Sequence, residues 1–403
     1  MTTEYAARKN EECYEHVYIL HHPDEEREAC RPLRTAPAYD RQKKLGAQFG
    51  QVNGWERPNY FGPVGADENF DHQSRSFRRG SWWKYALAEA KAIRSGVGII
   101  DATAFTKHIV KGPGASSFLD WFTCNKLPKV GRINLTYALT DAGTTRTEYT
   151  IVRLKQDEFY LVSAGAWTDY DADFLIKSAQ DKSPEFGYIE IQDVTSQWGV
   201  FAVAGPKSRD FLSQLVRDED QDTALSNARF PWLSFKRLEL EMCPINAIRV
   251  SYTGELGWEL HHPIEMQNYL FDLLQSAGAK DATPLEADLP RFVDMSKDFN
   301  GKLQMEKIGI RSKCVTFLID GPVDADPWGR EALYTEDGTE RVGRLTSGGY
   351  SVVFEKSIGM GYVKPSYAIE GTKLKVKIQN ALWDAVVTSD SPYDPKNEKL
   401  RNG

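Results

Sequence analysis

The chain has 403 residues, of which 41% are hydrophobic and 27% charged, and its formal net charge is −7. This composition is typical of a folded globular protein and excludes a disordered chain. Nucleic-acid binding depends on concentrated positive charge, and the acidic balance without a long basic run argues against such a partner. The length predicts about two to four domains.

Several classes of site and location are disfavoured by simple counts. No segment approaches the ~20 apolar residues that span a bilayer, and the charged N-terminus lacks the apolar core of a secretory signal. The five cysteines have neither zinc-site nor CxxC spacing. We therefore expect no metal site, no membrane partner and a reducing compartment: the cytoplasm or, in a eukaryote, the mitochondrial matrix.

Residues 1–75 are polar, rich in proline and charge, and weakly periodic. They predict a short helix near residues 40–45, followed by extended segments. A small basic cluster closes this region, and we interpret it as a solvated loop because short charge runs usually lie at the surface. The cluster consists of Arg75, Arg78 and Arg79.

Regular patterns begin after this region. Residues 82–96 have the apolar spacing of a helix that ends in glycine. Residues 133–154 predict a hairpin with an Asp-Ala-Gly turn, and a second hairpin is predicted over residues 247–263, with Gly254 and Gly257 at its tip. Strands and helices that alternate in this way predict an α+β fold.

From residue 311 to residue 387 the sequence is nearly all short strands and turns. This pattern is typical of a small barrel or sandwich. The chain should therefore end in a β module.

The two hairpins carry carboxylates beside aromatic residues, whereas a G-x-S-x-G motif and a metal-ligand cluster are absent from the sequence. A carboxylate accepts two parallel hydrogen bonds well, so it suits a heterocycle with an amino group and a ring N–H, and an aromatic wall would stack on that ring. The alternative is a pair of ordinary hairpins with exposed acids. The residues concerned are Tyr137, Glu148 and Tyr149 in the first hairpin and Tyr252, Glu255, Trp258 and Glu259 in the second.

From about residue 12 onward the chain resembles the C-terminal, folate-binding half of the dimethylglycine and sarcosine dehydrogenase family. That half is itself similar to the aminomethyltransferase (T-protein) of the glycine cleavage system. The resemblance is specific because many stretches occur in the same order. They are RPLRTAPAYDR, GQVNGWERPNYF, VGRINLTYALTDAGTTRTEYTIVRL, YLVSAGAWTDYDADFL, AGPKSRDFL, RVSYTGELGWEL, TPLEADL, DFNGK and VGRLTSGGYSVVFEKSIGMGYV.

The resemblance implies a three-domain aminomethyltransferase-like cloverleaf around a tetrahydrofolate pocket, with a C-terminal β-barrel. Residues 1–75 would be an extended segment, a remnant of the link to a flavin half in relatives. Residues 76–305 would form the folate-binding region, from two α+β subdomains, and residues 306–403 the barrel.

The resemblance also implies roles for particular residues. Glu148 would lie near the reactive nitrogens of the folate and act as the catalytic carboxylate, which stabilises a developing ammonium or carries a proton. Glu259 would pair with the pterin ring, and Tyr252 and Thr150 would line the pocket. Glu255 and Trp258 complete the expected cofactor-binding set.

The implied function is tetrahydrofolate-dependent one-carbon transfer: demethylation of a small N-methyl amine such as dimethylglycine or sarcosine, or of a related methylated compound, giving methylene- or methyl-tetrahydrofolate. The GxGxxG turn that opens the flavin half of the relatives is missing here, so we expect no FAD in this chain and regard a separate flavoprotein as a candidate partner. A helical segment that lines the pocket in relatives is also missing before Thr283. The alternative is therefore a non-catalytic folate-binding or partner subunit of a flavoprotein dehydrogenase.

Overall fold

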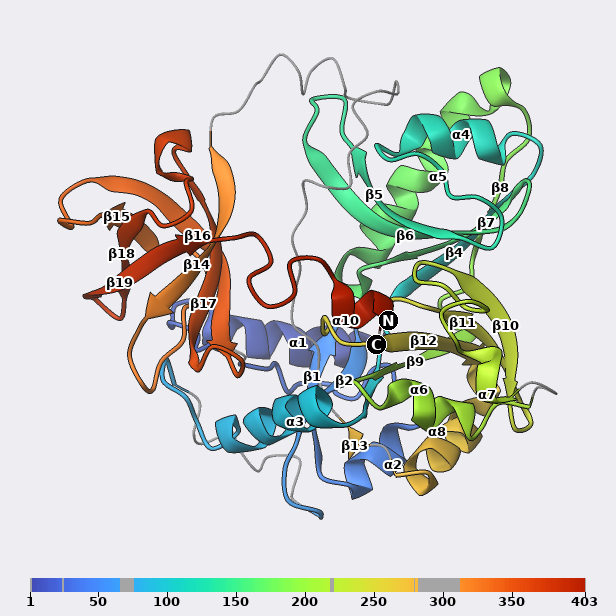
Figure 1. Cartoon of the computed structure of the whole chain (residues 1–403), viewed down its shortest axis with the longest axis horizontal. Coiled ribbons are helices and arrows are strands. Elements are labelled where there is room, and N and C mark those ends of the chain that lie inside the picture. Colours follow the sequence, from blue (N-terminus) through green and yellow to red (C-terminus); the bar gives the residue numbers. More distant parts are fainter. Residues whose placement is uncertain are drawn as a thin grey trace. The chain divides into compact units, whose positions relative to one another are not determined.

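The computed structural model describes residues 2–23, 25–65, 76–217, 221–278, 280–281 and 312–402 (Figure 1). Contacts divide the chain into two compact units. The barrel unit comprises Met1–Cys30, Asn69–Lys91 and Ile308–Glu398, and the two-sheet unit comprises Arg31–Glu68, Ala92–Lys307 and Lys399–Gly403.

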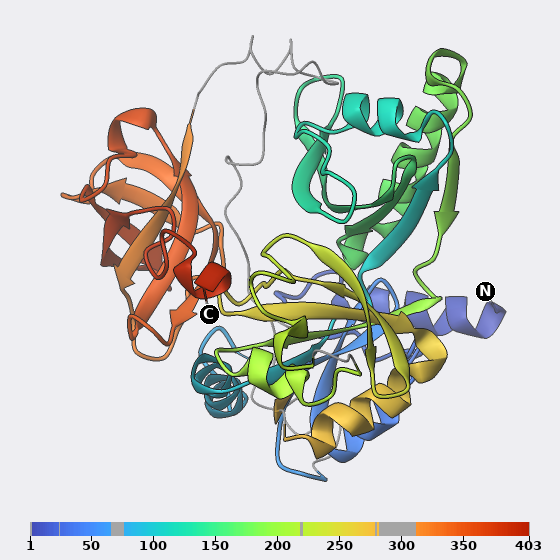
Figure 2. The ribbon, with the colours of Figure 1, turned by 45° about the vertical axis from the view of Figure 1, so that its right-hand side comes forward.

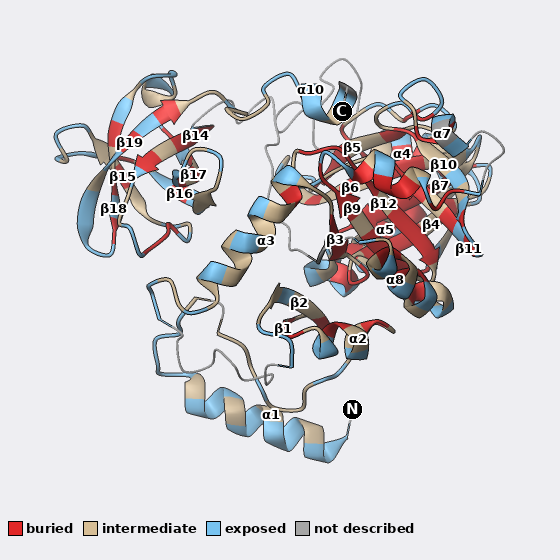
Figure 3. Cartoon of the chain, turned by 60° about the horizontal axis from the view of Figure 1, so that its bottom comes forward, coloured by how far each residue is buried: buried red, intermediate tan, exposed pale blue. Residues whose placement is uncertain are grey.

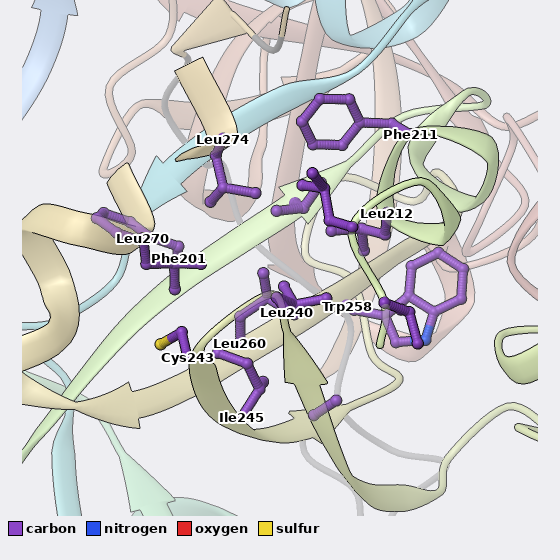
Figure 4. Packing of buried hydrophobic residues seen from close by; sticks show 14 of the residues in the cluster. Phe201, Phe211, Leu212, Leu240, Cys243, Ile245, Trp258, Leu260, Leu270 and Leu274 are labelled. Atoms are coloured by element: carbon purple, nitrogen blue, oxygen red, sulfur yellow. The ribbon is translucent and has the colours of Figure 1, made fainter. Parts of the chain in front are cut away.

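A six-stranded sheet forms one half of the two-sheet unit, in the order β10-β11-β12-β9-β3-β13. Its described pairs are antiparallel except that of β13 with β3. The strands are β3 (Gly98–Asp101), β9 (Trp198–Ala204), β10 (Phe235–Leu240), β11 (Cys243–Ile248), β12 (Gly257–Pro263) and β13 (Lys280–Asp281). One face buries a large apolar cluster to which three helices contribute, α6 (Ser208–Ser213), α7 (Gln221–Ala224) and α8 (Gln267–Ser276). Figure 4 shows part of this cluster.

A five-stranded antiparallel sheet forms the other half, in the order β5-β6-β7-β4-β8. Its strands are β4 (Thr106–Lys111), β5 (Ile133–Leu139), β6 (Thr145–Lys155), β7 (Glu158–Ser163) and β8 (Glu190–Asp193). The helices α4 (Ala115–Phe122) and α5 (Thr168–Phe186) cover one face. Side chains alternate along a strand, so β6 sends Tyr149 and Ile151 into the helix-side core and turns Glu148 to the other face.

The face of this sheet that carries Glu148 meets the six-stranded sheet through a second apolar cluster. Val152, Tyr160 and Val162 come from the five-stranded sheet, and Ile248 comes from β11. The interiors of both sheets are buried (Figure 3). The predicted hairpins at residues 133–154 and 247–263 are confirmed, and this cluster places them on facing surfaces.

The barrel unit confirms the predicted C-terminal β module as a closed barrel of six strands, in the order β14-β17-β16-β15-β18-β19 (Figures 1 and 2). The strands are β14 (Lys313–Asp320), β15 (Ala332–Thr335), β16 (Arg341–Ser351), β17 (Lys356–Val363), β18 (Lys373–Ile378) and β19 (Ala381–Thr388). Apolar side chains from all six fill its interior, with Phe317 and Leu345 fully buried.

The N-terminal region is more regular than the sequence suggested. Residues Thr3–His16 form the helix α1, although none of its residues is buried. The predicted short helix is confirmed as α2 (Tyr39–Lys44), and the extended segments after it pair as β1 (Ala47–Val52) and β2 (Trp55–Phe61). The helix α3 (Trp83–Ser95) matches its prediction, and α10 (Glu398–Asn402) ends the described chain.

The basic cluster is only partly a solvated loop. Arg78 is exposed and pairs with Asp324. The side chain of Arg79 is only 10% exposed, so the prediction was wrong for this residue. A bidentate bond to Asp326 explains the burial, because a charge leaves water only when it is paired. Arg75 and the short connection before Thr283 lie outside the described residues, as does the expected boundary near residue 305, and the three-part division remains a prediction.

Candidate functional site

Glu148 lies on β6 directly opposite Tyr137 of β5. The Tyr137 hydroxyl donates to Glu148 Oε2 across a distance of 2.6 Å. No other hydrogen bond or ion pair involves the Glu148 side chain among the described residues, which leaves most of its acceptor capacity open. Glu148 is half-buried, and Tyr137 is buried. Tyr137 therefore fixes the orientation of a carboxylate that can still receive a proton or a ligand donor.

Thr150 shares the face of Glu148, two residues further along β6. It pairs with Val162 of β7, and Val162 pairs with Lys107 of β4. These side chains form one row across the sheet, on the surface that meets the six-stranded sheet. The structure thus places Thr150 beside Glu148 and in line with a buried lysine.

Glu259 lies on the facing sheet. It pairs with Ile248 of β11, and residues that pair across two strands project from the same face. Since Ile248 belongs to the cluster between the sheets, Glu259 projects toward the surface that bears Glu148 and Thr150. Its carboxylate contacts the ring of His261, with 3.1 Å between Oε2 and Nε2. The two predicted carboxylates therefore occupy facing surfaces of the two sheets.

Tyr252 lies between β11 and β12 and is 43% exposed. Its ring contacts Phe105, with 5.9 Å between the ring centroids. Phe105 packs against the cluster between the sheets. Tyr252 therefore presents a partly exposed aromatic ring at the rim of that cluster.

Trp258 and Glu255 lie in a different environment from the other four predicted residues. Trp258 is 1% exposed and projects from the opposite face of β12 to Glu259, into the core with Phe211 and Leu212 (Figure 4). Glu255 is also buried and accepts a hydrogen bond from Arg94 at 2.8 Å. The structure therefore does not bring these two side chains together with Glu148.

A buried lysine lies beside the predicted residues. The ammonium of Lys107 donates to the carbonyl oxygens of Thr103 and Thr195, at 2.7 and 3.2 Å. Burial lowers the pKa of Lys107 to about 7, although the charges of Asp101, Asp193 and Glu259 oppose the shift. Lys107 therefore changes its charge near neutral pH, and it lies on the same face of the five-stranded sheet as Thr150.

Sequence reasoning missed Lys107, His261 and Tyr160. His261 had a signal, because residues two apart on a strand share a face and Glu259 precedes it by two. Tyr160 had none, since His261 is 101 positions away, and the partners of Lys107 are backbone carbonyls, which no side-chain pattern reveals. Tyr160 lines a groove of about 680 Å³ with Trp198, Phe235 and Arg237, and none of the six predicted residues lines that groove.

No group of three or more potential metal ligands occurs within the part of the chain that the structure describes. The helices in that part of the chain are all too short or too polar to cross a membrane.

Family models match most of the chain. Residues 38–285 match the GCVT N-terminal domain, and residues 313–394 match the glycine cleavage T-protein C-terminal barrel domain. Residues 1–36 match the central domain of FAD-dependent oxidoreductases.

Individual relatives support the same grouping. Mitochondrial dimethylglycine dehydrogenase of Mus musculus is 31% identical over 96% of this chain and 47% of its own length. The mitochondrial pyruvate dehydrogenase phosphatase regulatory subunit of the same organism is 28% identical over 86% of this chain and 43% of its own. The chain thus spans about half the length of these curated relatives.

The fold has a close counterpart among solved structures. The glycine cleavage system aminomethyltransferase T from Bartonella henselae superposes with a TM-score of 0.70 at 22% identity, covering 92% of this chain and 99% of that one. The predicted aminomethyltransferase-like α+β fold with a C-terminal barrel is therefore confirmed. Because a family model spans more than half of it, the chain belongs to the GCVT family, that of the glycine cleavage T-protein.

Proposed function

We propose that this chain performs tetrahydrofolate-dependent one-carbon transfer, with Glu148 as the catalytic carboxylate. The observation that carries the proposal is the pair Glu148 and Glu259. These carboxylates come from two sheets, project from facing surfaces, and each has a single hydrogen-bond partner among the described residues. Such acceptors suit a ligand with N–H groups at both ends of a flat ring system.

The residues present fit tetrahydrofolate in three respects. Glu259 offers a carboxylate to the amino group and ring N–H of a pterin, Tyr252 offers an exposed ring for stacking, and Glu148 offers a second acceptor. Trp258 and Glu255 are left out of direct contact, because core packing and the ion pair with Arg94 already occupy them.

The chemistry follows from charge. An N-methyl amine of the dimethylglycine or sarcosine class loses a hydride to a separate flavoprotein and becomes an electrophilic iminium. Tetrahydrofolate, when bound, would supply the nucleophilic nitrogen for this carbon. Glu148 would accept the proton that this nitrogen sheds and would pass it to the nitrogen of the demethylated amine, which then departs, while Tyr137 holds the carboxylate in place.

The first test is a titration with tetrahydrofolate, followed by fluorescence of the ten tryptophans. The second is Glu148→Gln, assayed with ¹³C-methyl dimethylglycine and a flavoprotein that oxidises it. We expect near-normal binding and a loss of methyl transfer of about 100-fold or more, the usual size of a general-base contribution. Glu190→Gln, on the partly exposed edge strand β8, is the matched control and should transfer normally. Absence of tetrahydrofolate binding, or full transfer by Glu148→Gln, contradicts the proposal.

A second candidate function is a partner subunit without catalysis. The similarity to a regulatory subunit favours it, as does the match of residues 1–36 to a flavoprotein domain. This candidate predicts that the wild-type chain binds tetrahydrofolate or the flavoprotein without methyl transfer. The same assay therefore separates the two.

A further inference from the structure

Glu259, His261 and Tyr160 form a continuous hydrogen-bonded chain between the two sheets. Glu259 Oε2 lies 3.1 Å from His261 Nε2, and His261 Nδ1 lies 2.9 Å from the Tyr160 hydroxyl. The His261 ring is fully buried, and Tyr160 is buried on β7 of the other sheet. The rings of Tyr160 and His261 meet edge to face, with 5.4 Å between their centroids.

The direction of each bond follows from the partners. A carboxylate only accepts hydrogen bonds, so His261 Nε2 carries the hydrogen that points at Glu259. In a neutral imidazole the other nitrogen is then an acceptor, and Nδ1 receives the Tyr160 hydroxyl. Burial lowers the pKa of His261 and keeps the ring neutral. Burial also raises the pKa of Tyr160, so the phenol keeps the proton that it donates.

The hydrogen bonds from Tyr160 through His261 affect how Glu259 can bind a ligand. The bond from His261 fills one of about four acceptor positions on the carboxylate and fixes the carboxylate plane. The other positions are not used by the described residues. A ligand that brings two parallel N–H donors then meets an acceptor that is already oriented, which lowers the entropy lost on binding.

We propose that Tyr160 and His261 are positioning residues that orient Glu259 toward the N–H donors of a pterin. This inference rests on the proposed tetrahydrofolate function and extends it to two residues on different sheets. Tyr160 acts through His261, and His261 acts through Glu259. Because Tyr160 belongs to the sheet that carries Glu148, the same bond links the two ligand-facing surfaces.

A spectroscopic experiment tests the hydrogen bonds between Tyr160, His261 and Glu259 without any ligand. Nitrogen-15 labelling of the seven histidines, with His261→Gln to assign the ring, reports the tautomer directly. We expect the neutral form with hydrogen on Nε2. A ring with hydrogen on Nδ1, or an imidazolium at pH 7, overturns the proposal whether or not tetrahydrofolate binds.

Binding experiments test the consequence. Tyr160→Phe removes only the hydroxyl and should weaken tetrahydrofolate binding about fivefold, the worth of one net hydrogen bond. His261→Leu removes the donor to a charged group and should weaken binding about 10- to 100-fold. His261→Gln restores a donor near Nε2 and should recover most of that loss.

The matched control is Tyr149→Phe. Tyr149 is also buried in the same sheet, but its hydroxyl has no hydrogen-bond partner within the part of the chain that the structure describes, and it projects from the helix side. Its replacement should leave tetrahydrofolate binding unchanged. If the wild type binds and all four variants bind equally well, the positioning role is wrong while the proposed function stands. If the wild type does not bind, the proposed function fails, and the tautomer measurement still decides the hydrogen-bonded chain.

Discussion

Tyr137 donates a hydrogen bond of 2.6 Å to Glu148 from the directly opposite position on the neighbouring strand. Cross-strand pairing fixes the two backbones, so the hydroxyl and the carboxylate meet without a long flexible linker. Glu148 is thereby held on the surface that faces the second sheet, although it lies on a strand whose alternate residues fill a core.

Replacing Tyr137 by Phe should lower both the rate of methyl transfer and the free energy of unfolding. We expect turnover to fall about tenfold, because the accepting carboxylate loses its fixed orientation, and the free energy of unfolding to fall by about 1 kcal/mol. Steady-state transfer and urea unfolding measure the two effects. Tyr149→Phe, next to Glu148 on the opposite face, should keep normal turnover. Equal turnover in the Tyr137 variant and the wild type would contradict the orienting role.

The ion pair between Arg94 and Glu255 should stabilise the two-sheet unit. Glu255 is buried, and its carboxylate lies 2.8 Å from Arg94 and 3.7 Å from Lys399. Arg94→Met removes the shorter of these two ion pairs from a buried carboxylate, so we expect a loss of about 2 kcal/mol in the free energy of unfolding, measured by urea unfolding.

The exposed pair between Lys177 and Asp173 provides the control for Arg94. Both of its side chains are more than half exposed. Lys177→Met should therefore change stability by no more than about 0.5 kcal/mol. If Arg94→Met and Lys177→Met lower the free energy of unfolding by similar amounts, burial of the carboxylate does not determine how much an ion pair stabilises the protein.

In the barrel unit, Arg79 should tolerate lysine poorly. Its guanidinium stacks on Trp83 at 3.9 Å and on Tyr350 at 4.8 Å, and it bonds both oxygens of Asp326. Lysine has neither the planar fork nor the stacking surface, so Arg79→Lys should cost about 2 kcal/mol of stability in thermal or urea unfolding. The neighbouring substitution Arg78→Lys affects an exposed pair and should be nearly neutral. A neutral Arg79→Lys would contradict the role of stacking.

Lys107 predicts a pH dependence of stability. The unfolded chain binds a proton on this lysine up to a pH of about 10.4, whereas the folded chain binds it only below a pKa of about 7. Between these values the unfolded state binds more protons, so the free energy of unfolding should rise with pH by up to about 1.4 kcal/mol per unit. Lys107→Met should remove that slope.

Urea unfolding at pH 7, 8 and 9 checks this prediction. Lys111→Met is the control on the same strand, because Lys111 is partly exposed and pairs with Glu190 at 3.2 Å. Its profile should follow that of the wild type. If the free energy of unfolding of Lys107→Met depends on pH in the same way as that of the wild type, burial does not lower the pKa of this lysine.

Local patterns predicted much of the fold. Alternation along residues 145–155 indicated a strand, and the turn residues before it indicated a hairpin. The short strands after residue 311 indicated the β module that closes as a barrel. The helix α1 was missed because helical periodicity is weak when no residue is buried.

The sequence by itself determined which side chains share a face of a strand, because the alternation of side chains is a property of the backbone. Alternation places Glu148 and Tyr149 on opposite faces, and likewise Glu259 and Trp258, although Trp258 was expected in the same cofactor-binding set as Glu259. Only the tertiary structure decided what each face meets: a core for Trp258, the ring of His261 for Glu259, and through that ring the hydroxyl of Tyr160. The physical reason is that burial and hydrogen bonding depend on residues about a hundred positions apart, such as Tyr160 and His261, which only the packing of the two sheets brings within bonding distance.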